Sequence, residues 1–337
     1  MTSDTPMKSD DPKRRNEINR LIDRIKESAD NLGRDSATRG DLKILSRALR
    51  ELRYGFKVFA PYRRDHKVTV FGSARTKPEE PSYQQAIEFG RAMAEKDWLV
   101  VTGAASGIME AGHVGAGREK SMGLNIMLPF EQEANSVIAG DHKLVNMKYF
   151  FTRKLLFVKE CNAVVCLPGG FGTLDEAMEV LTLLQTGKRD MVPVVLLDAP
   201  GGSYWNTLDH FIRKELLDGG MISPADLHLY KLTDNCQVAV DEVLNFFKSY
   251  HSMRYVNDQL VLRIQERVSD SLLAEINAEF GDILHSGTIE QVAALPDEEN
   301  EPDLLDLPRL SMHFNRRSLG RLRRLIDCVN EGRMLDC

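Results

Sequence analysis

Short apolar strands alternate with helical stretches from residue 67 to about residue 217, and this alternation limits the possible folds of the chain more than any other feature. Parallel strands need crossover connections, usually helices, so the alternation predicts a mostly parallel sheet covered on both faces. The expected strands are 68–71, 98–102, 123–128, 143–147, 163–167 and 192–197. The expected helices are 81–96, 107–120, 152–161, 173–186 and 204–217.

Different patterns flank this α/β region. Residues 1–15 are polar and are expected to be disordered. Apolar residues at spacings of three and four then predict two amphipathic helices within 16–64. After the main domain, 65–250, residues 251–337 are expected to form a small α+β appendage. Its expected elements are strands 260–264 and 310–314, a helix at 272–280, an acidic loop at 296–308 and a basic helix at 318–329.

Composition excludes several classes of protein. The net charge is −6, which gives no overall attraction to nucleic acid or to anionic membranes. The apolar runs are far shorter than the roughly 20 residues of a membrane span, and the N-terminus lacks the apolar core of a signal peptide. The five cysteines form no Cys-x-x-Cys pair, which argues against a disulfide framework and a zinc site. We expect a cytoplasmic protein that binds neither membranes nor nucleic acid.

Three of the expected strands end in turns made of small residues. These turns contain Gly72-Ser73, Gly103 to Gly107 with Ser106 between them, and Pro168 to Thr173. Small side chains let the backbone approach an anion, and a following helix offers unpaired N–H groups. One such turn is equally well explained as a simple connection between a strand and a helix. Three turns at the carboxyl edge of one sheet favour a phosphate site.

Motifs for other phosphate or hydrolytic chemistries are missing from the sequence. It contains no Gly-x-x-x-x-Gly-Lys-Ser/Thr loop, and no Gly-x-Gly-x-x-Gly follows the first strand. It has neither a Gly-x-Ser-x-Gly elbow nor a His-Glu-x-x-His helix. A small phosphorylated ligand, acted on by nearby charged groups, fits what remains.

Two charged sites lie close to these turns in the sequence. Glu176 follows the third turn by one helical turn, so it either faces the ligand cleft or simply favours the helix dipole, worth about 0.3–1 kcal/mol. Arg153 and Lys154 begin the helix that precedes the third turn. Cations are unfavourable at a helix N-terminus, so they indicate a nearby anion, or else a solvated helix face.

Together these residues resemble a known family. Pro168-Gly-Gly-Phe-Gly-Thr-Leu-Asp-Glu176 is similar to the Pro-Gly-Gly-x-Gly-Thr-x-x-Glu signature of the Lonely Guy (LOG) family, long mislabelled as lysine decarboxylases. Arg153-Lys154 resembles the Arg-Lys pair that accompanies this signature, and 23 residues separate Arg153 from Glu176 (176 − 153), as in the family. The resemblance covers about residues 65–250.

The resemblance implies a Rossmann-like, doubly wound homodimer or higher homo-oligomer that needs no metal or cofactor. It implies a phosphoribohydrolase that cleaves a nucleoside 5'-monophosphate into free base and ribose 5-phosphate, with AMP, related purine nucleotides and cytokinin nucleotides as candidate substrates. Arg153 and Glu176 would be the catalytic pair. The substrate-binding residues would be Gly72, Ser73, Gly103, Ser106, Gly107, Lys154, Pro168, Gly169, Gly170, Gly172 and Thr173.

The chain departs from the family pattern at two places. Ala104 and Ala105 replace glycines of the second turn, and Tyr149-Phe150-Phe151 stands before Arg153, where plant-type members carry Met-His. The alanines keep a second hypothesis open, a nucleotide-binding protein without turnover. His113, which follows the second turn, is expected to be a structural or surface residue. The arginines of the C-terminal basic helix are expected on a solvated face or paired with the acidic loop.

Overall fold

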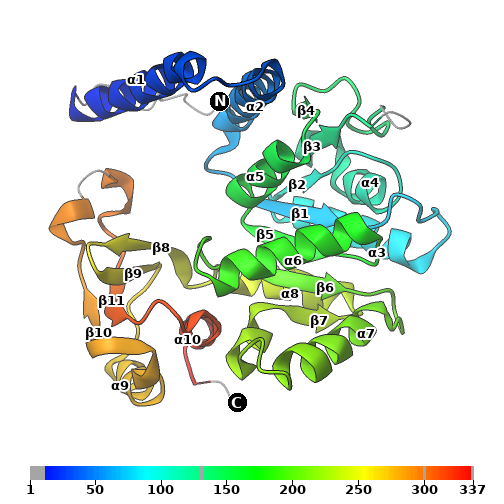
Figure 1. Cartoon of the computed structure of the whole chain (residues 1–337). Helices are drawn as coiled ribbons and strands as arrows, with labels where there is room; N and C mark the ends of the chain where they lie inside the picture. The colour runs from blue at the N-terminus through cyan, green and yellow to red at the C-terminus, as the bar shows by residue number, and fades with distance from the viewer. Residues whose placement is uncertain (1–11, 129–132, 299–300, 335–337) are drawn as a thin grey trace, which may run out of the picture. The chain divides into compact units, whose positions relative to one another are not determined.

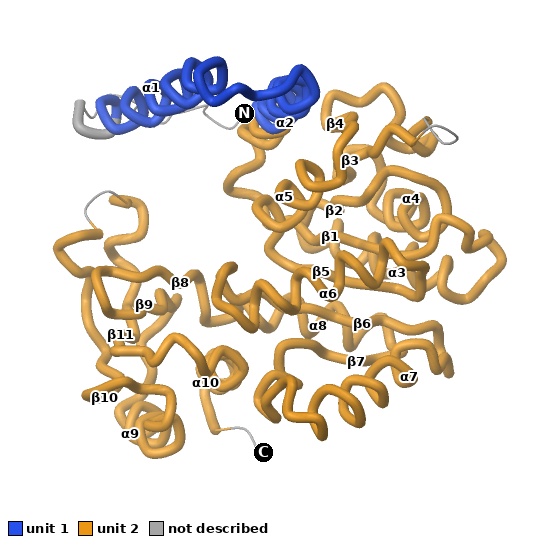
Figure 2. Tube along the Cα trace, viewed as in Figure 1, with its two compact units in different colours: residues 1–54 blue, residues 55–337 orange. Residues whose placement is uncertain are grey.

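The structure, a computed structural model, describes residues 12–128, 133–298 and 301–334. The chain forms two compact units, residues 1–54 and 55–337 (Figure 2). Residues 1–11 of the expected disordered tail lie outside the described residues. Residues 12–15 belong to helix α1, so helix replaces the disorder expected there.

The two N-terminal helices that the sequence predicts are α1 (Pro12–Arg34) and α2 (Arg39–Phe59). The division between the units falls within α2, ten residues before the expected boundary at 64 and 65. Gly55, the first residue of the second unit, packs closely against Leu156 of the same unit, since a Cβ at Gly55 would lie 2.4 Å from Leu156 Cδ1. The boundary expected at 250 lies inside the second unit and stays a prediction.

The second unit contains the expected sheet with helices on both of its faces (Figure 1). All seven strands are parallel, in the order β4-β3-β2-β1-β5-β6-β7. The strands are β1 (Lys67–Phe71), β2 (Leu99–Thr102), β3 (Ser121–Ile126), β4 (Leu144–Met147), β5 (Ala163–Cys166), β6 (Val194–Leu197) and β7 (Lys231–Thr233). The helices are α3 (Pro81–Glu95), α4 (Ile108–Lys120), α5 (Phe150–Glu160), α6 (Phe171–Gln185), α7 (Tyr204–Phe211) and α8 (Cys236–Phe246). The α/β, Rossmann-like fold class is therefore confirmed.

The strand order reverses between β1 and β5. Successive strands run outward from β1 to β4, and the chain then returns to place β5 on the other side of β1. Phe71 pairs with Cys166 at the ends of these two strands, so the first and third turns leave the sheet side by side. Ligands of such sheets bind beyond the carboxyl ends of the strands at this kind of reversal. The topology therefore places the glycine-rich turns where a ligand site is expected.

The C-terminal region forms a separate antiparallel sheet, as expected for an α+β appendage. Its strands, in the order β10-β11-β9-β8, are β8 (Tyr250–Val256), β9 (Gln259–Ile264), β10 (Leu284–Val292) and β11 (Arg309–Phe314). Helices α9 (Asp270–Glu279) and α10 (Leu319–Glu331) accompany it. The apolar side of α10 is buried, and the helix contacts α8 and the short 3₁₀ helix Pro224–Leu229, which precedes β7.

Three strands, β7, β8 and β10, and the α-helix α8 are not predicted by the sequence patterns. β7 is a three-residue, partly exposed edge strand, and shifts in register interrupt β8 and β10. Interrupted or very short strands show little of the two-residue alternation that marks a strand in a sequence. Among the described residues, no helix is long and apolar enough to cross a membrane.

Candidate functional site

The three small-residue turns are hydrogen-bonded to one another. Ser73 N donates to Pro168 O (3.1 Å), and Ile108 N donates to Ser73 O (3.0 Å). The hydroxyl of Ser106 donates to Ala74 O at 2.8 Å. The first turn thus ties the second and third together at the carboxyl edge of the sheet.

A cavity of about 740 Å³ opens at this junction. Nine of the thirteen residues predicted as catalytic or substrate-binding line it: Gly72, Ser73, Gly103, Arg153, Gly169, Gly170, Gly172, Thr173 and Glu176. The other four, Ser106, Gly107, Lys154 and Pro168, are not among the lining residues. Ser106 and Pro168 contribute to the bonds between turns, whereas Gly107 and Lys154 have roles described below.

The glycines of the turns divide into two groups. Gly107 has φ +65°, and a Cβ there would lie 2.2 Å from Ser73 O. A Cβ at Gly169 would lie 2.1 Å from Thr173 Oγ1. Gly170 and Gly172 instead face open space, with no atom within 4 Å of a Cβ built there. Packing therefore requires glycine at 107 and 169, while the absence of a side chain at 170 and 172 leaves room for a ligand.

The open glycines lie at the N-terminus of α6. Gly170 is the N-cap of this helix and makes no side-chain capping bond. The first N–H groups of a helix lack partners within the helix, and its dipole favours an anion there. This end of the cavity therefore has the geometry of a phosphate site.

The second turn keeps its shape despite its alanines. Ala104 adopts a left-handed backbone (φ +60°), a conformation that glycine accepts more readily. Its N–H donates to Thr102 Oγ1 (3.0 Å), and its carbonyl accepts from Asn135 N (2.8 Å). The side chain of Asn135 also donates to Ala105 O at 3.1 Å. These bonds hold the turn in place.

His113 lies beneath the second turn and is fully buried. Its Nε2 is 3.0 Å from Met122 O and 3.1 Å from Thr102 Oγ1, and its Nδ1 is 3.2 Å from Asn135 Nδ2. Burial lowers the pKa of the imidazole to about 4, so it is neutral at physiological pH. His113 supports the turn, the structural role that the sequence predicts.

Arg153 and Glu176 face each other across the cavity. Arg153 Nη2 lies 4.0 Å from Glu176 Oε1, and both side chains are largely buried. The guanidinium carbon of Arg153 lies 5.4 Å from the ring centroid of Phe150 and 5.6 Å from that of Phe157. Its Nε is buried and has no hydrogen-bond partner among the described residues. The pair is close enough for attraction but makes no direct hydrogen bond, which leaves both groups able to bind a ligand.

The electrostatics of the pair are unusual for an Arg–Glu contact. Burial lowers the pKa of Arg153, and Glu176 offsets only part of that effect. Burial raises the pKa of Glu176, although Lys154 and Arg153 oppose the shift. The charged forms of both groups are therefore disfavoured relative to water, a condition common at active sites.

Lys154 binds carboxylates rather than lining the cavity. Its Nζ lies 3.0 Å from Asp175 Oδ2, 3.4 Å from Glu176 Oε2 and 2.5 Å from Glu179 Oε2. Desolvation lowers its pKa, but these carboxylates outweigh that effect and raise it overall. The arrangement places Lys154 behind Glu176, where it orients this carboxylate.

Sequence patterns missed several residues of the site. Tyr204, at the start of α7, donates its hydroxyl proton to Gly169 O (2.7 Å) and so fixes the third turn. Asn125, at the end of β3, and Met109, on α4, line the cavity. None belongs to a turn or motif, and only the order of the strands brings them to the site. No group of three or more potential metal ligands occurs in the described part of the chain.

The chain is similar to members of one protein family and, weakly, to several solved structures. Residues 103–243 match the family described as "Possible lysine decarboxylase". The chain is similar to the cytokinin riboside 5'-monophosphate phosphoribohydrolase LOG7 of Arabidopsis thaliana, with 30% identity over 60% of this chain and 91% of that protein. LOG3 of the same plant, which carries the same activity in its name, is 34% identical over 47% and 72% of the two chains. The molybdenum cofactor carrier protein MCP from Chlamydomonas reinhardtii has a TM-score of 0.37 and 21% identity over 53% of this chain and 98% of that chain, too slight a likeness to support an argument.

Proposed function

This chain belongs to the Lonely Guy (LOG) family, and we propose that it hydrolyses the N-glycosidic bond of a nucleoside 5'-monophosphate, releasing free base and ribose 5-phosphate. The observation that carries the proposal is the facing pair of Arg153 and Glu176, 4.0 Å apart, in the cavity that is also lined by the third turn, the proposed phosphate turn. A site for phosphate alone needs the turn but not this pair.

The 5'-phosphate binds at the N-terminus of α6. The open positions Gly170 and Gly172 let its oxygens reach the backbone, and Thr173 adds a hydroxyl. This contact anchors the nucleotide with its ribose beside Glu176, one turn further along the same helix.

The reaction breaks the bond between ribose C1' and the base nitrogen. The electron pair leaves with the base, positive charge develops on the ribose, and a water oxygen bonds to C1'. The carboxylate of Glu176 stabilises this charge and orients the water, whose proton replaces the sugar on the base. Arg153 binds the nucleotide through its guanidinium, whose charge Glu176 neutralises only in part.

A purified sample incubated with AMP, GMP, IMP and CMP tests the proposal, with released base measured by chromatography. We expect base and ribose 5-phosphate in equal amounts from at least one nucleotide. Binding of nucleotides without release of base would instead support a carrier, the alternative favoured by the alanines of the second turn. The resemblance also predicts a homo-oligomer, which light scattering on the same sample tests.

A further inference from the structure

The end of the cavity away from the phosphate turn has a distinct chemical character. At the end of β3 the cavity is lined by the apolar Ile126 and Leu128 and by one amide, Asn125, and the apolar Met109 of α4 and Phe150 of α5 line it as well. Nucleobase sites combine apolar walls with a few polar groups that fix the orientation of the ring. Of the charged residues that line the cavity, Arg153 comes from α5, Glu176 from α6 and Arg75 from the segment after the first turn.

The spacing of the strands sets the distance between the two ends. The phosphate turn follows β5, and Asn125 lies near the end of β3, with β1 and β2 between them. Three steps of about 4.8 Å separate β5 from β3, so the two ends are about 14 Å apart. A nucleotide anchored by its phosphate at α6 extends its base along this edge toward β3.

A neighbouring strand holds the amide of Asn125 in place. Asn125 Nδ2 donates to Asn146 Oδ1 at 3.0 Å, and the two residues pair in the register of β3 and β4. Asn125 is only 4% exposed, so its amide cannot turn away into solvent. One N–H and the carbonyl oxygen of this amide are not used in that bond.

We propose that Asn125 selects the base, and that it favours 6-aminopurine over 6-oxopurine nucleotides. The inference rests on the proposed function, because it presumes a nucleotide anchored by its phosphate at α6. The remaining N–H of the amide donates to purine N7, and its carbonyl oxygen accepts from the 6-amino group, the pairing that asparagine makes with adenine. A 6-oxo group presents a lone pair to the carbonyl oxygen of Asn125. One hydrogen bond is lost, and the two oxygens repel each other.

The test measures binding of four ligands: AMP, IMP, purine riboside 5'-monophosphate, which lacks the 6-amino group, and 7-deaza-AMP, which lacks N7. Calorimetry on the Glu176→Gln variant keeps turnover from interfering. We expect each of the last three ligands to bind about 10-fold more weakly than AMP, or weaker still.

Two variants then connect the preference to Asn125. Asn125→Leu, close in size but without hydrogen-bonding groups, should bind all four ligands with affinities within about 3-fold of one another. Asn245→Leu, on the exposed side of α8, is the matched control and should keep the preference for AMP. Ribose 5-phosphate, which has no base, should bind equally to both variants.

Two results would overturn the proposal: equal binding of AMP and IMP before Asn125 is changed, or an unchanged preference in the Asn125→Leu variant. The comparison of ligands in the protein that keeps Asn125 decides the matter even where the Asn125→Leu variant does not fold. Failure of the proposed function looks different, since the wild-type protein would then bind nucleotides with this preference and release no base. A lack of binding of all four ligands would overturn both.

Discussion

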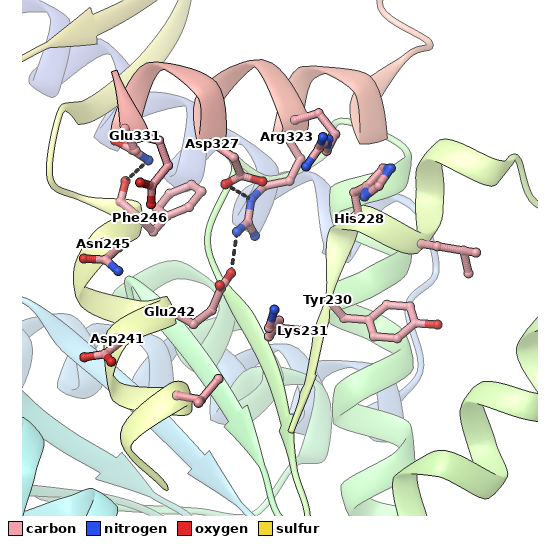
Figure 3. Close-up of a pocket in the computed structure, with 14 residues that line it drawn as sticks. His228, Tyr230, Lys231, Asp241, Glu242, Asn245, Phe246, Arg323, Asp327 and Glu331 are labelled. Carbon is pink, nitrogen blue, oxygen red and sulfur yellow. Dashed lines mark hydrogen bonds and ion pairs between the residues drawn. The ribbon is translucent and has the colours of Figure 1, made fainter. Parts of the chain in front are cut away.

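Two cavities of this protein are each lined by a buried arginine, and the arginines differ in how they are neutralised. Arg153 lines the cavity of about 740 Å³ at the carboxyl edge of the parallel sheet. Arg323 lines a cavity of about 390 Å³ formed by α8, α10 and residues around β7 (Figure 3). Each arginine has one buried nitrogen without a partner in the described parts of the chain, Nε of Arg153 and Nη1 of Arg323.

The difference lies in the carboxylates. Two of them hold Arg323: Glu242 on α8 accepts from Nη2, and Asp327 on α10 accepts from Nε at 2.9 Å (Figure 3). Desolvation lowers the pKa of Arg323, but both carboxylates outweigh it and raise the pKa overall. Arg153 faces a single carboxylate at 4.0 Å, and its pKa is lowered. An unpartnered nitrogen is therefore common to both arginines, and what distinguishes Arg153 is that its charge is only partly neutralised.

Replacing Glu176, the carboxylate that faces Arg153, is expected to have the largest effect on activity. Glu176→Gln should lower kcat by about 100-fold to 1000-fold, because it removes the charge that stabilises the developing positive ribose. Stability should not fall. Since the pKa of Glu176 is raised in the folded protein, its ionised form is disfavoured there, and any stability that it contributes is lost as pH rises through that pKa. A fully active Glu176→Gln variant would remove the distinction between the two cavities.

The opposite result is expected at Arg323, the arginine that binds two carboxylates. Arg323→Met removes the guanidinium that binds both Glu242 and Asp327, and should lower the free energy of unfolding by about 3 kcal/mol. Activity per folded molecule should be unchanged, because no described residue of α10 lines the cavity of Arg153 and Glu176. Arg321→Met is the control on the same helix. Its ion pairs with Glu279 and Asp282 are more exposed, so urea titration should show a loss of about 1 kcal/mol or less.

Substitutions of two glycines test whether each lacks a side chain to make room for a ligand or to allow close packing. Gly172→Ala meets no atom, so it should leave the protein stable while weakening binding of ribose 5-phosphate by about 10-fold, as measured by calorimetry. Gly169→Ala should lower the melting temperature, because its Cβ would overlap Thr173 Oγ1. Equal effects of both changes on stability would mean that packing alone explains the glycines.

The smallest effect concerns pH. If hydrolysis needs the ionised carboxylate, kcat should rise with pH through the raised pKa of Glu176. Lys154 is the strongest of the groups that lower this pKa, so Lys154→Met should move the acid limb of the pH–rate profile to higher pH. A limb that moves to lower pH, or stays in place, would show that Lys154 does not act through Glu176.

Much of the fold follows from local patterns. All six strands expected in the parallel sheet are present, with ends within two residues of the expected positions. Buried parallel strands are continuous apolar runs, which makes them easy to recognise. The C-terminal helix shows the limit of this reasoning. Its arginines were expected on a solvated face or beside the acidic loop, but Arg323 is buried against α8, and Arg321 pairs with Glu279 and Asp282 around the end of α9.

The sequence by itself determined the three turns, the helix dipole at α6 and the spacing of Arg153 from Glu176, because each depends on a short segment of chain. Only the tertiary structure decided which of these residues face the cavity. It placed Lys154 behind Glu176, gave Gly107 a packing role and brought Asn125 and Tyr204 to the edge of the sheet. These positions depend on strand order and crossover connections, through which residues distant in sequence share one surface.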